Sequence, residues 1–191
     1  VIILVVGAEI NAEMEHQTSK DTTDFMGDYA ASDDNAAAYG EKNSVSNVYV
    51  KLDEGSDAGT IRALARAATE AGAMVKLVAP KLGGAVLSDG RRHAADGQLA
   101  GTPSVVFDAV AVVLSAEAGA RLARESAAVD FVAFAFAHLK AIAHDHGAAA
   151  LVEAARVEPD AGIVGAGDVR AFLAAAARRQ WEREPTLRLL T

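Results

Sequence analysis

The segment that most constrains the fold is residues 107–114, Phe-Asp-Ala-Val-Ala-Val-Val-Leu, which is almost continuously apolar. A strand of this composition is buried on both faces, as strands in the interior of a parallel sheet are. Parallel strands need crossover connections, and these are usually helices. The segment therefore predicts an α/β domain in which helices cover both faces of a sheet.

Strand and helix patterns alternate around this segment, as hydrophobic periodicity, caps and breakers indicate. This alternation predicts a flavodoxin-like, doubly wound, mainly parallel sheet with helices on both faces. The expected elements are a strand at 47–52, a helix from Ser56 or Asp57 to Gly72, a strand at 74–78, a small hairpin at 85–90, strand 107–114, helix 129–138, strand 140–143, helix 147–155, strand 161–164 and helix 168–179 capped by Asp168.

Charge is distributed unevenly along the chain. Residues 1–46 hold nine acidic residues and two lysines, which is −7 of the net charge of −8. Residues 11–46 are also poor in branched apolar side chains, so we expect a long loop or extension with one short helix near 33–39. The chain is therefore divided into residues 1–46, an acidic N-terminal strand plus this loop, and residues 47–191, the flavodoxin-like domain.

The first nine residues have the pattern of a first strand running into Gly-Ala-Glu. They are either the true first strand of the fold, with an insertion before Asn47, or an extra strand, a linker remnant or a fused segment. The apolar run at 1–6 is too short to span a bilayer and lacks the basic flank of a signal peptide.

Composition excludes several functions. The acidic balance, with a pI of about 5.1, opposes binding to nucleic acid and to anionic membranes. The absence of cysteine excludes disulfides, thiolate metal sites and a cysteine nucleophile. A cysteine-free chain suits a reducing compartment, and we expect a cytoplasmic protein.

Several motifs resemble a known domain. They are Ala79–Gly83, Ser88–Gly90, the longer run Asp96–Val110 and the C-terminal Trp181–Pro185. Together these residues resemble the C-terminal domain of large-subunit haem catalases, and the likeness begins near Asn47. That domain has the fold of the class I glutamine amidotransferase-like superfamily, which includes PfpI-type proteases.

The resemblance implies a degenerate active site. Enzymes of the superfamily place a cysteine at a sharp turn after a central strand, and gapless alignment puts Asp145 near that position. A carboxylate cannot replace a thiolate there without its supporting site. We therefore expect no catalytic residue and no cofactor site in this chain. The degenerate nucleophile-turn region consists of Ala143, His144, Asp145 and His146.

Two further regions differ from an active superfamily member. The superfamily's activating acidic residue follows the first strand, where this chain has 53–57, Asp-Glu-Gly-Ser-Asp. We interpret these carboxylates as capping and solvating a helix start. Leu114–Ala118 stands where catalase domains usually have a Pro-Gly-Gly turn, so an anion-binding use of that turn is not expected.

Two sharper site hypotheses remain weak. His144 and His146 lie two residues apart, so an extended segment would point both imidazoles to one side, as a metal pair requires. No third ligand is evident, and we expect no metal site. Ser115 lies at a strand end where a nucleophile with a histidine partner is conceivable, but the Gly-x-Ser-x-Gly elbow is missing.

The helical context of His138 and of the basic C-terminus indicates their roles. His138 falls on the apolar side of a helix, so we expect a core or interface histidine. The C-terminus is basic, and it is either a helix end whose cations suit the helix dipole or a docking surface for the rest of a catalase or for the acidic N-terminal segment. Its members are Arg178, Arg179, Arg183 and Arg188, with Trp181.

The resemblance implies an accessory, non-catalytic domain of a large-subunit catalase, whose haem, in another domain, converts hydrogen peroxide to water and oxygen. The implied partners are the catalase core domain and a homo-oligomer, a tetramer that this domain stabilises, with chaperone-like activity as a further possibility. The alternatives are a free-standing PfpI-like holdase that binds unfolded clients or a small-molecule hydrolase. A metal-dependent hydrolase using His144, Asp145 and His146 is the weakest interpretation.

Overall fold

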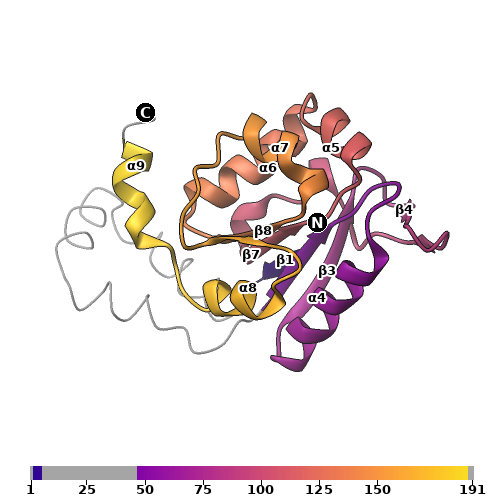
Figure 1. Cartoon of the computed structure of the whole chain (residues 1–191), viewed down its shortest axis with the longest axis horizontal. Coiled ribbons are helices and arrows are strands. Elements are labelled where there is room, and N and C mark those ends of the chain that lie inside the picture. The colour runs from indigo at the N-terminus through magenta and orange to yellow at the C-terminus, as the bar shows by residue number, and fades with distance from the viewer. Residues whose placement is uncertain (1, 6–46, 189–191) are drawn as a thin grey trace, which may run out of the picture.

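The computed structural model of the chain describes residues 2–5 and 47–188 (Figure 1). Its centre is a seven-stranded sheet with the order β6-β3-β2-β1-β7-β8-β9. Every pairing other than those of β1 is parallel. The strands are β1 (Ile2–Val5), β2 (Asn47–Lys51), β3 (Met74–Ala79), β6 (Gly97–Gln98), β7 (Phe107–Val112), β8 (Ala141–His144) and β9 (Ile163–Gly165).

Strand β1 differs from its neighbours in direction. It pairs antiparallel with both β2 and β7, while β2 and β7 also pair directly and in parallel, from Val48 opposite Ala109 to Lys51 opposite Val112. The first strand of a doubly wound unit is parallel to its neighbours, so β2 has that place and β1 is an additional strand. The helix expected near 33–39 lies outside the described residues.

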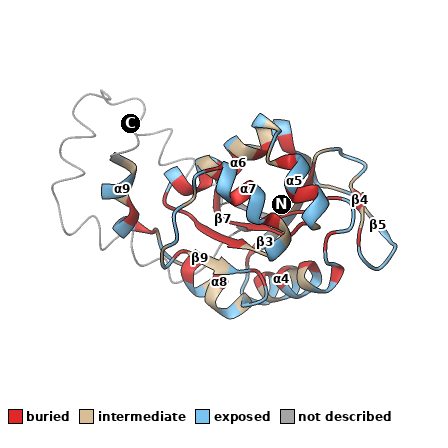
Figure 2. Cartoon of the chain, turned by 45° about the horizontal axis from the view of Figure 1, so that its top comes forward, coloured by how far each residue is buried: buried red, intermediate tan, exposed pale blue. Residues whose placement is uncertain are grey.

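Helices cover both faces of the sheet, as Figure 1 shows. The first face carries α4 (Ala58–Glu70) and α8 (Val169–Ala176), and the opposite face carries α5 (Ala116–Leu122), α6 (Ser126–Ala137) and α7 (Ala149–Ala154). Figure 2 shows buried residues along the strands and on the helix sides that face them. This arrangement confirms the predicted doubly wound, mainly parallel α/β fold. The chain ends with η4 (Trp181–Arg183) and α9 (Glu184–Arg188).

The predicted core strand and first helix form for the local reasons that the sequence indicates. All six residues of β7 are buried. The carboxylate of Asp57 accepts a hydrogen bond from the backbone N–H of Thr60 at 2.6 Å and caps α4, which buries Ile61 and Leu64. Gly72 follows the helix at a φ of +82°, a conformation that glycine adopts without strain.

Several described elements differ from the sequence prediction, among them α5, β6 and the C-terminal α9. Helix α5 was not expected, because its sequence, Ala-Glu-Ala-Gly-Ala-Arg-Leu, has only one large apolar residue and a central glycine. Strand β6 is only two residues long and pairs with the edge of β3. The predicted hairpin is confirmed as β4 (Ala85–Val86) and β5 (Arg92–His93), which pair antiparallel.

Two buried cations hold the amino ends of the central strands. The Lys140 ammonium donates to the backbone oxygens of Val105 and Phe107. The Arg183 side chain, 1% exposed, donates to Asp160 at 2.5 and 3.0 Å and to the backbone oxygens of Phe136 and Lys140. Its guanidinium also lies 4.1 Å from the centroid of the Phe136 ring.

These contacts correct two sequence interpretations. Arg183 is a structural residue that is covered by the domain, so it is not available to a docking surface. Arg178 is exposed, and Arg179 pairs with Asp108 at 3.5 Å. His138 is the exposed C-cap residue of α6 and not a core residue, because its position falls where the helix ends, and its role as an interface histidine stays a prediction. The side chain of Arg188 lies outside the described residues.

None of the described helices has the length and apolar composition needed to cross a membrane.

Candidate functional site

The carboxyl ends of β2, β7 and β8 meet at one edge of the sheet. Their register places Lys51 opposite Val112 and Val112 opposite His144. Doubly wound domains bind ligands at this edge. The structure therefore brings together the three regions that the sequence singled out, namely the loop at 53–57, Ser115, and the turn at 143–146.

Asp145 acts as a structural residue in the turn after β8. Its carboxylate accepts hydrogen bonds from the backbone N–H of Leu114 at 3.0 Å and of Ala148 at 3.0 Å, which caps η3 (His146–Ala148). Burial raises the pKa of Asp145, although these hydrogen bonds act in the opposite direction. Its φ of −93° and ψ of 176° are ordinary extended values, unlike the strained turn of a nucleophile elbow.

Backbone packs directly on backbone around this turn. A Cβ atom at Gly147 would overlap the carbonyl oxygen of Leu114, and a Cβ atom at Gly119 would overlap the carbonyl oxygen of Gly147. Helix α5 therefore lies against the turn after β8, which in turn lies against the end of β7. We call this contact of Gly119, Gly147 and Leu114, together with the Asp145 hydrogen bonds, the strand-end joint.

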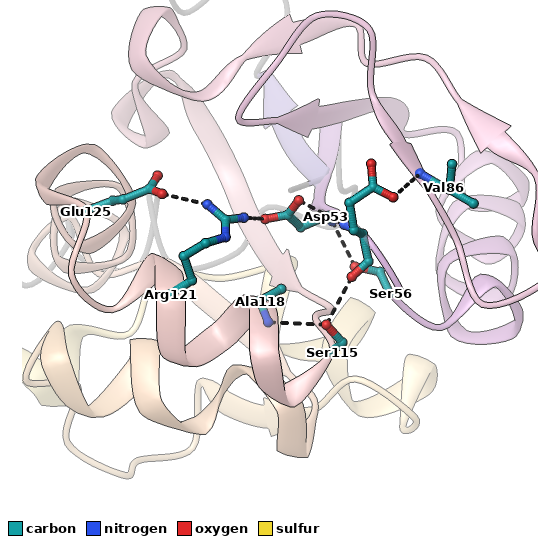
Figure 3. Close-up of polar contacts among 8 residues, drawn as sticks. Asp53, Ser56, Val86, Ser115, Ala118, Arg121 and Glu125 are labelled. Atoms are coloured by element: carbon teal, nitrogen blue, oxygen red, sulfur yellow. Dashed lines mark hydrogen bonds and ion pairs between the residues drawn. The ribbon is translucent and has the colours of Figure 1, made fainter.

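Ser115 is used as a helix cap. Its hydroxyl accepts from the backbone N–H of Ala118 at 3.2 Å and donates to the backbone oxygen of Glu54 at 3.0 Å (Figure 3). Within the described part of the chain, no hydrogen bond joins Ser115 to His144 or His146. The arrangement accordingly lacks the nucleophile–base contact of a serine triad.

The two histidines flank Asp145 but do not share an extended segment. His144 ends β8, with its Nδ1 at 3.1 Å from the backbone oxygen of Asp145, whereas His146 is exposed and begins η3. The extended segment that a metal pair would require therefore ends at Asp145, and His144 and His146 do not share it. In residues 2–5 and 47–188, no group of three or more His, Asp or Glu side chains is arranged to hold a metal ion.

The acidic loop after β2 has three structural roles. Asp57 caps α4, as predicted, and Glu54 accepts from the backbone N–H of Val86 at 3.0 Å. Asp53 is 6% exposed and forms an ion pair with Arg121. The sequence does not predict this pair, because Arg121 belongs to the unexpected helix α5. Arg121 also donates to Glu125 at 2.6 Å (Figure 3).

Lys51 is 0% exposed, and the charges of both members of this ion pair act on its amine. No hydrogen-bond partner of its Nζ is present among the described residues. Burial lowers the pKa of Lys51 to about 7, although the carboxylates of Asp53 and Glu125 raise it, and Arg121 lowers it further. The sequence gives little signal for this burial, since a lysine in a strand is usually exposed.

Comparison with known proteins decides the family. Residues 47–180 match the family described as the C-terminal domain found in long catalases. The chain belongs to this family. It is 40% identical over 142 residues to "Catalase C" of Rhizobium meliloti (strain 1021), a match that covers 71% of this chain and 20% of that protein. It is 34% identical over 119 residues to "Catalase-B" of Dictyostelium discoideum, a match that covers 59% of this chain and 17% of that protein.

The catalase C-terminal domain therefore spans about a fifth of the length of these catalases. Solved structures support the fold. A ThiJ/PfpI domain protein from Brachyspira murdochii has a TM-score of 0.55 at 14% identity, covering 68% of this chain and 92% of that chain. Drosophila melanogaster DJ-1beta has a TM-score of 0.54 at 15% identity, covering 75% and 97%. These likenesses confirm the predicted PfpI-type fold.

The catalase family implies haem, but the cavity found near the C-terminus of this domain does not fit it. Haem iron is held by an axial His, Tyr, Cys or Met beside a large apolar slot. The cavity found near the C-terminus has a volume of about 220 Å³ and contains none of these residue types. Its lining consists of Asp160, Ala161, Arg178, Arg179, Gln180, Trp181, Glu182 and Arg183. We derive no chemistry of this domain through haem.

Replacement of Lys51 by Met should change how the stability of the domain depends on pH. The pKa of Lys51 is about 7 in the folded chain and 10.5 in the unfolded chain. Between these values the unfolded state binds more protons, so the free energy of unfolding rises with pH, by at most about 1.4 kcal/mol per pH unit. Below pH 7 both states are protonated and the cost of burying the charge is fully present.

Urea denaturation from pH 6 to pH 9.5 measures this dependence. Lys51→Met should be more stable than the parent chain at pH 7 and should lose the rise above that pH. Lys76→Met, which replaces an exposed lysine, is the matched control and should retain the rise. Equal pH dependence in the parent chain and Lys51→Met would contradict the burial of a neutral amine.

Proposed function

We propose that this chain is an accessory domain of a longer catalase and stabilises the assembled enzyme without performing chemistry itself. In this proposal residues 47–191 form the accessory domain, residues 1–46 precede it, and hydrogen peroxide is converted at haem in another part of the protein. The partners are the catalase core and further copies of the same protein, and the compartment is the cytoplasm. Membership of the long-catalase family supports the proposal.

The single observation that carries the non-catalytic part is the strand-end joint. The edge where this fold places its sites is filled by backbone contacts between Gly147 and Leu114 and between Gly119 and Gly147. The polar groups there already have structural partners, because Asp145 binds two backbone N–H groups and Ser115 caps α5. A reacting group needs access to substrate and a base within hydrogen-bond reach, so the structural roles of Asp145 and Ser115 support a non-catalytic domain.

Removal of this domain from a long catalase of the family should separate its stabilising role from the peroxide chemistry of the rest of the enzyme. A truncated enzyme should keep its peroxide turnover per haem, since the domain supplies no reacting group. It should lose activity at a lower temperature and dissociate at a lower urea concentration than the full-length enzyme. Catalase assays after heating and analytical ultracentrifugation in urea measure these effects.

Two results would contradict the proposal. One is a truncated enzyme that resists heat and urea as well as the full-length enzyme does. The other is measurable peroxide turnover by the 191-residue chain itself. The separately expressed chain mixed with the truncated enzyme is a useful control, because restored resistance would show that the domain acts by binding.

A second candidate, a holdase that binds unfolded proteins, is favoured by exposed apolar side chains. Val106 is 50% exposed, Phe134 49% and Trp181 46%, and these residues lie in the segment before β7, in α6 and in η4. Exposed apolar surface is a common feature of sites that bind other proteins. Unlike the accessory role, this activity requires no catalase core.

Suppression of the aggregation of reduced insulin, followed by light scattering, tests the holdase. The chain should reduce scattering at equimolar concentration, and Phe134→Ser should weaken the effect severalfold. Leu82→Ser is the matched control, because Leu82 is also exposed but lies in the loop after β3, at the other end of the strands. Undiminished scattering at a tenfold excess of the chain would exclude this candidate.

A further inference from the structure

The buried amine of Lys51 is unlike the other charged groups of the domain. It is fully covered, lies at the carboxyl end of β2, and has no hydrogen-bond partner within the described residues. Burial of an amine without a partner favours its neutral form. The strand-end joint, Ser115 and Asp145 do not involve this amine, so its burial has no role in the structure described so far.

The charged groups that act on Lys51 are few. Among the described residues they are Asp53 in the loop after β2, Arg121 in the last turn of α5, and Glu125 between α5 and α6. The neighbouring strands and α4 contribute none. Two of the three groups therefore belong to one short segment, α5 and the residues that follow it.

Arg121 is the outermost of these groups, with a side chain that is 51% exposed, whereas the Asp53 side chain is 8% exposed. The ion pair between them fastens α5 to the loop after β2 (Figure 3). A protonated Lys51 would be a second cation beside the same carboxylate. It would compete with Arg121 for Asp53 and repel the Arg121 guanidinium.

We propose that the buried amine of Lys51, acting on the neighbouring Asp53–Arg121 ion pair, makes α5 a proton-sensitive latch. Protonation of the Lys51 amine releases α5 from the carboxyl edge of the sheet, and loss of that proton fastens it again. Release of α5 uncovers Leu122, which is 0% exposed, and separates Gly119 from Gly147. The latch thus controls whether the strand-end joint is closed.

The proton linkage has a defined sign and size. The amine has a pKa of about 7 in the closed structure, and in this proposal opening of α5 returns it toward the ordinary value of 10.5. The open state therefore binds the proton more tightly, and opening becomes about tenfold rarer for each pH unit between 7 and 10. Below pH 7 the opening equilibrium no longer changes with pH on account of this residue.

Amide hydrogen exchange of the 191-residue chain tests the latch, measured from pH 6 to pH 9 and corrected for the intrinsic exchange rate. The reporters are the N–H groups of Gly119 and Ala123, which donate to backbone oxygens within α5. Phe172 in α8, on the opposite face of the sheet, is the internal reference. Lys51→Met and the exposed-site control Lys76→Met are measured in parallel.

The α5 amides should be less protected than Phe172, and their protection should rise about tenfold per pH unit above pH 7. Lys51→Met should abolish the rise, Lys76→Met should keep it, and Arg121→Gln should lower α5 protection at every pH. Protection of α5 that is independent of pH would overturn the proposal. So would protection in α5 and α8 that is equal and rises together, because only global unfolding would then be linked to the proton.

Discussion

The packing of Gly147 against the carbonyl oxygen of Leu114 is the contact on which the carboxyl edge of the sheet depends. It brings the turn after β8 onto the end of β7, where the Asp145 carboxylate receives the N–H groups of Leu114 and Ala148. Because the turn after β8 lies on the end of β7, Gly119 of α5 can pack against that turn. The edge that holds ligands in many doubly wound domains is closed by the fold itself.

Three buried cations differ in how the free-energy cost of removing a charge from water is offset. Arg183 is bound by the Asp160 carboxylate and two backbone oxygens, and Lys140 by two backbone oxygens. These contacts hold the amino ends of the strands together. Among the described residues Lys51 has no such partner, and burial lowers its pKa, so the cost is offset by loss of its proton. The carboxyl edge thus contains a charge that changes with pH.

Much of the fold could be predicted from the sequence, because the relevant signals are local. The apolar run at 107–114 gave the central strand, and the caps Asp57 and Asp168 gave the starts of α4 and α8. Helix α5 was missed because its buried face has only one large apolar residue, Leu122, beside Ala118 and Gly119, which carry almost no periodic signal. The family was predicted from motifs, and the comparisons confirmed it.

The site was harder to predict, because its chemistry depends on contacts between residues far apart in the chain. The pairing of Asp53 with Arg121 joins positions 68 residues apart, and no local pattern shows it. The burial of Lys51 and of Arg183 also depends on residues far apart in the chain. No local pattern shows it, because long cationic side chains are usually exposed. The spacing of His144 and His146 suggested a shared direction, but the turn into η3 at His146 removes the extended geometry on which that inference rested.

The most direct test of the closed edge is the free energy of unfolding of Gly147→Ala, measured by urea denaturation of the chain beside Gly165→Ala. A methyl group at Gly147 would overlap the Leu114 carbonyl oxygen, whereas the space around Gly165 within the described structure is open. We predict that Gly147→Ala loses about 2 kcal/mol or more, because backbone must move, and that Gly165→Ala changes stability by less than about 0.5 kcal/mol. Equal tolerance of both substitutions would contradict the account, since it would show that the carboxyl edge has room for a side chain and therefore for a ligand.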